Sequence, residues 1–289
     1  MNKVIAIFKL TRIEHSIMLV IAVIAAELIV GGIPPLNIFI LSLLTPFLTS
    51  MGAFAINDYF DVETDRANKR KERPIVSGDI SRKSAYKIAL LCLIFGTAGS
   101  IFINIYAFAI AVVFSILSYL YSYKLKDILL IGNAYIAFSM AIPFIYGNFV
   151  VATQINSNIV LITFIIFLSG LAREIHGMIR DKSGDLKIRK SKNLVYYIGA
   201  NKSAWFALIL YAESIMISIF LFIYELPFKY NLVYIIPITA ANLAVLYMAA
   251  RYLSDDKRGF FDLSRNVSLV AMTIALLTYL LSSIFYVAL

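Results

Sequence analysis

Two groups of acidic residues at helical spacing are the side chains in this sequence best suited to chemistry. Asn57, Asp61 and Asp65 recur every four residues, and Asp181 and Asp185 are again four residues apart. Side chains at this spacing stack on one face of a helix, and the first group covers about 12 Å along the helix axis. Stacked carboxylates repel one another. The sequence therefore predicts that a cation lies among them.

Mg²⁺ is the cation that suits these groups best, because it prefers oxygen ligands and is often shared between carboxylates and substrate phosphates. Basic residues flank both groups, including Lys69 and Arg73 after the first and Arg173 before the second. They could neutralise the remaining phosphate charge. One such pair at a membrane boundary is usually a solvated surface feature, but two pairs on the same side favour a site. The pattern is typical of a ligand with a diphosphate head and a hydrocarbon tail.

The segments that must position these groups are strongly apolar. Hydrophobic residues make up 61% of the 289 positions and charged residues 15%, with a mean hydropathy of +0.84, whereas soluble domains have about 25% charged residues. We expect an all-α, polytopic membrane protein with a single domain over residues 1–289, because the apolar runs are long and unbroken. Nine transmembrane helices are predicted, near 14–30, 38–58, 84–104, 107–123, 128–151, 158–176, 204–225, 231–250 and 267–288. The longest connecting segments, near 60–83 and 177–203, hold the aspartates of both groups.

The net charge of +9 is distributed unevenly over this topology. Of the 26 Lys and Arg residues, all but Lys229 fall on the face that carries the N-terminus and both acidic groups. Cytoplasmic loops carry the excess of Lys and Arg in membrane proteins. We therefore expect a multi-pass protein of the cell membrane, with the N-terminus and the site loops in the cytoplasm and the C-terminus outside.

A transporter or channel is the alternative from a different functional class. Transporters bind their ligands near the bilayer midplane, and Glu213 and Asn242 lie inside the seventh and eighth predicted spans. Such residues also serve as ordinary hydrogen-bonding partners between helices. Because the acidic groups lie at one surface, we favour an enzyme.

The motif N-D-x-x-D-x-x-x-D from Asn57, with R-P-I-x-S-G from Arg73 to Gly78 and a second D-x-x-x-D, resembles the UbiA superfamily of intramembrane prenyltransferases. The resemblance covers nearly the whole chain. It implies nine helices around a central cavity that is open toward the lipid. It also implies that short helices from the two long cytoplasmic loops cap this cavity.

The resemblance further implies a Mg²⁺-dependent reaction in which an allylic diphosphate ionises and a lipophilic acceptor captures the carbocation. In this family pattern Asn57, Asp61, Asp65, Asp181 and Asp185 are the catalytic ligands of two Mg²⁺ ions that bridge the diphosphate. Substrate-binding residues are then expected in the Tyr/Lys patch that closes the fourth helix and in the basic loops: Arg12, Lys69, Arg73, Tyr121, Tyr123, Lys124, Lys126 and Arg173.

The sequence around residues 72–81 and 173–175 is most similar to the archaeal branch of the family. Members of that branch transfer a geranylgeranyl group from its diphosphate to geranylgeranylglyceryl phosphate, in ether-lipid synthesis. The additional bases Lys124, Lys126 and Arg173 would fit an anionic acceptor. Membrane lipid is the expected environment, no nucleic-acid partner is expected, and the oligomeric state is left open.

The chain departs from the family pattern at two places. Close relatives often have an acid where Met178 stands, so the second acidic group is poorer in ligands. Residues 12–15, Arg-Ile-Glu-His, lack the Arg-Pro and Asn that are common at the start of the first helix. The second departure concerns the acceptor pocket, and it keeps prenylation of an aromatic ring in quinone biosynthesis as the alternative reaction.

Overall fold

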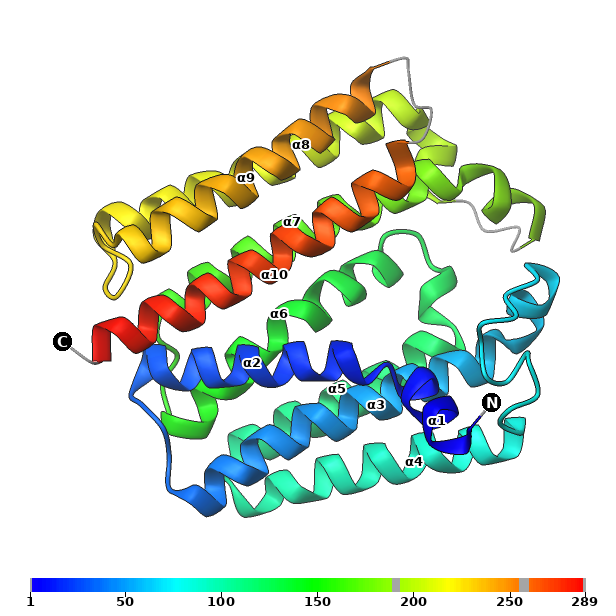
Figure 1. Ribbon diagram of the computed structural model, residues 1–289, viewed down its shortest axis with the longest axis horizontal. Coiled ribbons are helices and arrows are strands. Elements are labelled where there is room, and N and C mark those ends of the chain that lie inside the picture. The colour runs from blue at the N-terminus through cyan, green and yellow to red at the C-terminus, as the bar shows by residue number, and fades with distance from the viewer. Residues whose placement is uncertain (1, 189–192, 255–259, 288–289) are drawn as a thin grey trace.

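The computed structural model describes the backbone of residues 2–188, 193–254 and 260–287, and the side chains of these residues except 181–188 and 287. Within these ranges the chain forms ten α-helices and two short 3₁₀ turns and contains no strand (Figure 1). The α-helices are α1 Lys3–Thr11, α2 Ile13–Val30, α3 Leu36–Ala67, α4 Arg82–Gly99, α5 Ile105–Tyr123, α6 Ile131–Val151, α7 Ser157–Ile188, α8 Leu194–Tyr224, α9 Leu232–Leu253 and α10 Phe260–Val287. The 3₁₀ turns are η1 Ser100–Phe102 and η2 Leu125–Asp127.

Nine helices in the described part of the chain, α2 to α10, are long and apolar enough to cross a membrane, as predicted. The predicted ends at the basic face are too short, however. Helix α3 continues to Ala67 instead of ending near 58, and α7 continues to Ile188 instead of 176. Helix α8 begins at Leu194 instead of 204, although Gly199 interrupts it. Hydropathy falls where a helix leaves the hydrocarbon, but the backbone hydrogen bonds of the helix continue beyond that point.

Helix α3 is the element that joins the membrane to the first acidic group. Its 32 residues have a length of about 48 Å at 1.5 Å per residue, whereas the hydrocarbon core of a bilayer is about 30 Å thick. The last turns of α3 must therefore extend beyond the hydrocarbon. These turns carry Asn57, Asp61 and Asp65.

The nine spanning helices form a closed circuit. Each packs against the next one along the chain, and α10 packs against α2, while α2 also packs against α6. Figure 1 shows the N-terminus at the end of the bundle where α3 is joined to α4, and the C-terminus at the opposite end. The acidic face of α3 thus lies at the same end as the N-terminus. The central cavity implied by the family resemblance stays a prediction.

The two long loops differ in whether the described residues form the short capping helices that the resemblance implies. Residues 68–81 form a series of turns, which is held in place because Ile75 and Ile80 are buried against Ile56 of α3. At the second loop, α7 continues through Gly184, because one glycine in a helix costs only about 1 kcal/mol. Gly199, with non-helical backbone angles of φ 82° and ψ 163°, separates a short helix at residues 194–198 from the rest of α8.

Helix α1 was not predicted, because the apolar run that defines the first span begins only after it. Ala6 and Leu10 are fully buried and pack with Ala55 and Ile56 of α3. The chain then turns at Arg12, which has left-handed backbone angles of φ 46° and ψ 58°. This turn places the side chain of Arg12 beside the last turns of α3.

Close packing of α6 on α2 depends on Gly147. A Cβ atom added at Gly147 would lie 2.8 Å from the Cβ of Ala26 and 2.9 Å from the carbonyl oxygen of Val23. Both distances are shorter than van der Waals contact, and the backbone of α2 cannot yield like a flexible side chain. Small residues allow this kind of close approach between transmembrane helices.

We expect Gly147→Ala to lower the free energy of unfolding by about 1–3 kcal/mol, because an added methyl group overpacks this contact. Thermal unfolding of the purified protein in detergent measures the effect. Gly31→Ala is the matched control, because a Cβ atom there meets nothing within 4 Å. Equal melting temperatures for the two variants would contradict the packing argument.

Candidate active site

The three predicted ligands of the first acidic group lie on the final turns of α3, as the spacing indicated. Asp65 is 4% exposed and the side chain of Asp61 is 13% exposed. The Oδ1 atom of Asn57 is buried and has no hydrogen-bond partner in the described part of the chain. A buried amide oxygen without a partner is unfavourable, and with two carboxylates it makes an oxygen-only donor set. This set fits Mg²⁺.

Lys126 is brought to this face from a distant part of the sequence. Its Nζ atom lies 2.6 Å from Oδ1 of Asp61, and the two side chains are 11% and 13% exposed. Lys126 belongs to η2, which packs tightly against the start of α6. A Cβ atom added at Gly132 would lie only 2.8 Å from the Cα atom of Lys126. The predicted lysine is therefore held beside the predicted ligand.

Arg12 and Arg73 converge on an acid that the sequence did not single out as a site residue. Asp58 is 3% exposed, and its Oδ1 atom accepts from Nη2 of Arg12 at 3.1 Å and from Nη1 of Arg73 at 2.8 Å. Arg73 also places its Nε atom 3.7 Å from Oδ2 of Asp65, and Arg70 lies 3.4 Å from the other oxygen of Asp65. Two predicted substrate-binding residues therefore reach the acidic face of α3.

A signal for Asp58 was present in the sequence. Asp58 stands three residues after Ala55 and four before Val62, and both are buried in the structure. An ionisable residue on the apolar face of a membrane helix must be paired, because a lone charge there is costly. Attention to that face would have predicted a buried ion pair at position 58.

The other predicted substrate-binding residues have different surroundings. Tyr121 stacks on Tyr135 of α6, with 4.7 Å between ring centroids. Tyr123 and Phe60 of α3 pack edge to face, with 5.7 Å between ring centroids. Lys69 and Lys124 are exposed at the same end of the bundle. The Nε atom of Arg173 donates to Ser268 of α10 at 3.2 Å.

The second acidic group is described only in its backbone. Asp181 and Asp185 lie on the last turns of α7, but their side chains lie outside the described residues, so their role stays a prediction. Among the side chains that are described, no three His, Cys, Asp or Glu residues are placed to hold a metal ion together. Asn57, Asp61 and Asp65 would therefore need ligands from α7, a diphosphate or water.

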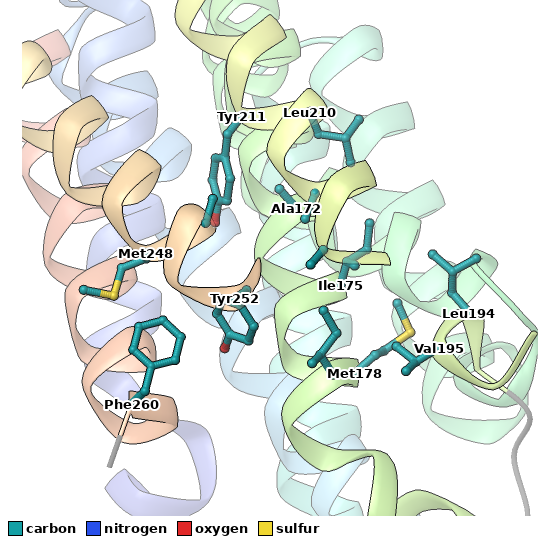
Figure 2. Packing of buried hydrophobic residues seen from close by; sticks show 14 residues of the cluster. Ala172, Ile175, Met178, Leu194, Val195, Leu210, Tyr211, Met248, Tyr252 and Phe260 are labelled. Carbon is teal, nitrogen blue, oxygen red and sulfur yellow. The ribbon is translucent and has the colours of Figure 1, made fainter. Parts of the chain in front are cut away.

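Met178 has a structural reason to be apolar. It is 6% exposed and belongs to a buried cluster formed by α7, α8, α9 and α10. Figure 2 shows Met178 beside Val195, with Ile175 one turn earlier on α7. Nearby, His176 stacks on Tyr252 with 3.8 Å between ring centroids. An acid at position 178 would be buried among hydrocarbon groups. This burial explains why the chain has Met178 where close relatives often have an acid.

The comparisons with known proteins agree with this arrangement. A family model described as "UbiA prenyltransferase family" matches residues 18–270. A protein of Archaeoglobus fulgidus named digeranylgeranylglyceryl phosphate synthase is 35% identical over 280 residues, which cover 95% of this chain and 94% of that protein. A solved structure described as giving insights into digeranylgeranylglyceryl phosphate synthase in membranes has a TM-score of 0.78 at 29% identity, covering 98% of this chain and 99% of that one. A UbiA homologue from Archaeoglobus fulgidus bound to DMAPP and Mg²⁺ has a TM-score of 0.70, covers 98% of this chain and 99% of that one, and at 18% identity shows the fold alone.

We expect Lys126→Met to lower the free energy of unfolding by about 1–3 kcal/mol, because Asp61 would lose a cation in a mostly buried position. MgCl₂ should restore part of the loss, since a divalent cation can balance the same carboxylate. Thermal unfolding with and without MgCl₂ measures both effects. Lys124→Met is the control, because Lys124 is exposed, and a similar decrease in both variants would contradict the role of the pair.

Proposed function

This chain belongs to the UbiA prenyltransferase family, and we propose that it transfers a geranylgeranyl group from its diphosphate to geranylgeranylglyceryl phosphate. In this reaction the bond between the allylic carbon and the diphosphate oxygen breaks, and an ether bond forms to the hydroxyl oxygen of the acceptor. The hydroxyl proton is released and diphosphate leaves. The observation that carries the proposal is the oxygen-lined face of α3, where the amide oxygen of Asn57 has no partner among the described residues and lies beside two carboxylates.

The site has the charges that a metal-bound diphosphate needs. We assign Asn57, Asp61 and Asp65 as metal ligands from α3, together with Asp181 and Asp185 from α7. When bound, Mg²⁺ neutralises the diphosphate and stabilises the negative charge that develops as it leaves. Oxygen donors and the lack of His or Cys among these residues favour Mg²⁺ over softer metals.

The basic residues at the same end of the bundle would complete the diphosphate site. Lys126 and Arg73 already contact Asp61 and Asp65, so cations lie where the leaving group would be held. Fixed charges of this kind stabilise developing charge most strongly where water is excluded. The apolar helices that continue from this end would accommodate the prenyl chain.

The choice of acceptor rests on charge and on the relatives. Lys124 is exposed at this end, and Arg173 lies on α7 with 21% of its side chain exposed. Both could bind a phosphate group on the acceptor. The Archaeoglobus fulgidus relative, at 35% identity over almost the full length of both proteins, carries the name of the corresponding synthase.

We propose that this end of the bundle faces the cytoplasm. The N-terminal helix and the α3–α4 connection share it (Figure 1), and basic residues are concentrated on the loops assigned to it. Positively charged loops are retained in the cytoplasm during insertion. The C-terminus, at the opposite end, would then lie outside.

We expect Asp61→Asn to reduce prenyl transfer by at least about a hundredfold, because losing a ligand charge weakens both metal binding and leaving-group stabilisation. Release of diphosphate from geranylgeranyl diphosphate, with EDTA or MgCl₂, provides the assay. Glu63→Gln is the matched control, because the side chain of Glu63 is 70% exposed and pairs with Arg66 on the same helix. Activity of Asp61→Asn equal to that of Glu63→Gln, or full activity in EDTA, would refute the metal assignment.

We expect the purified protein to prenylate geranylgeranylglyceryl phosphate and not the corresponding alcohol, because the basic residues recognise the phosphate. Incubation with geranylgeranyl diphosphate and a panel of acceptors, followed by mass spectrometry, tests this choice. The panel should include an aromatic acid. A prenylated aromatic acid without the ether product would overturn the proposed acceptor and support the aromatic alternative.

A further inference from the structure

Asp58 is an almost fully buried acid that contacts two arginines. Its side chain is 2% exposed, although it directly follows Asn57 on α3. Its Oδ2 atom has no hydrogen-bond partner in the described part of the chain, whereas Oδ1 accepts from two guanidinium groups. A role for Asp58 must therefore act through these two arginines.

The arginines come from two separate segments, and hydrophobic packing already brings these segments to the same end of α3. Arg12 lies at the left-handed turn between α1 and α2, and its guanidinium carbon is 4.6 Å from the centre of the Phe54 ring. Arg73 lies in the turns between α3 and α4, and its Nε atom is 3.7 Å from Asp65. Asp58 is the residue of α3 to which both arginines donate a hydrogen bond.

The guanidinium groups of Arg12 and Arg73 repel each other, because both lie within hydrogen-bond distance of the same oxygen atom. Burial lowers the pKa of Arg12 from its usual value and the charge of Arg73 lowers it further, while Asp58 raises it. The buried carboxylate therefore offsets the repulsion between two like charges. Without it, the arginines would separate toward solvent, where water screens their charges.

We propose that Asp58 is a positioning residue that holds Arg12 and Arg73 together beside Asp65, as a cationic pair for the diphosphate of the prenyl donor. Arg70 also contacts Asp65, so the three guanidinium groups and the two carboxylates together leave a net positive charge. Each guanidinium has several N–H donors, and the contact with Asp58 uses one from each arginine. This inference rests on the proposed function, because it requires a diphosphate substrate.

The first test is the kinetics of Asp58→Asn in the full-length protein with geranylgeranyl diphosphate and MgCl₂. We expect the KM for the diphosphate to rise by about tenfold or more while kcat changes less than about threefold, because the arginines bind the same phosphates before and during reaction. Glu63→Gln is the matched control on α3, and its KM should equal that of the wild type. An unchanged KM in Asp58→Asn would overturn the proposal.

The second test separates positioning from a general structural effect. In an Arg12→Gln/Arg73→Gln background, adding Asp58→Asn should change the KM by less than about twofold, because no guanidinium group remains to be positioned. A further several-fold rise would overturn the proposal, and this comparison also decides the matter if Asp58→Asn alone does not fold. If the wild type itself transfers no prenyl group, the proposed function fails. Turnover by the wild type with an unaffected Asp58→Asn variant refutes only the positioning role.

Discussion

A carboxylate removed from water is stable only beside a cation, and the site end of this bundle is organised by that requirement. Asp58, Asp61 and Asp65 are all largely buried on α3, and each lies beside a base from another segment. These bases come from the junction of α1 and α2, from the turns after α3 and from η2. The same ion pairs therefore anchor three connecting segments to one helix. Because these pairs are partly shielded from water, removing one partner costs more than it does at a surface salt bridge.

The parts of the molecule that depend on local sequence could be predicted, and those that depend on distant partners could not. Long apolar runs predicted nine spans, and a four-residue spacing placed Asn57, Asp61 and Asp65 on one helix face. The partners of the buried acids are separated from them by 46 and 15 residues at Asp58 and by 65 at Asp61. No periodicity encodes such contacts. Helix ends were misplaced for a related reason, since hydropathy reports the edge of the membrane rather than the last helical hydrogen bond.

The two acidic groups are supported in different ways. The first is surrounded by ion pairs that connect α3 to the chain before and after it. The second follows a stretch of α7 whose side chains, including Ile175 and Met178, are packed in an apolar cluster with α8, α9 and α10. Electrostatic contacts thus fix one side of the proposed diphosphate site, and hydrophobic packing fixes the helix that leads to the other. Substitution of a nearby charged residue should therefore move the acidic side chains of α3 more than it moves helix α7.

The unbroken length of α3 ties the proposed reaction to the thickness of the bilayer. A helix longer than the hydrocarbon layer can tilt, or leave its last turns in the headgroup region, at a cost of a fraction of a kcal/mol per Å of mismatch. The internal proline of α3, Pro46, lies well before Asn57, Asp61 and Asp65, and the helix is continuous from there to these residues. A thicker membrane therefore brings their oxygens closer to the hydrocarbon. A thinner membrane moves them toward water. The depth of the acidic face is thus a property of the protein and its lipid together, set through one helix.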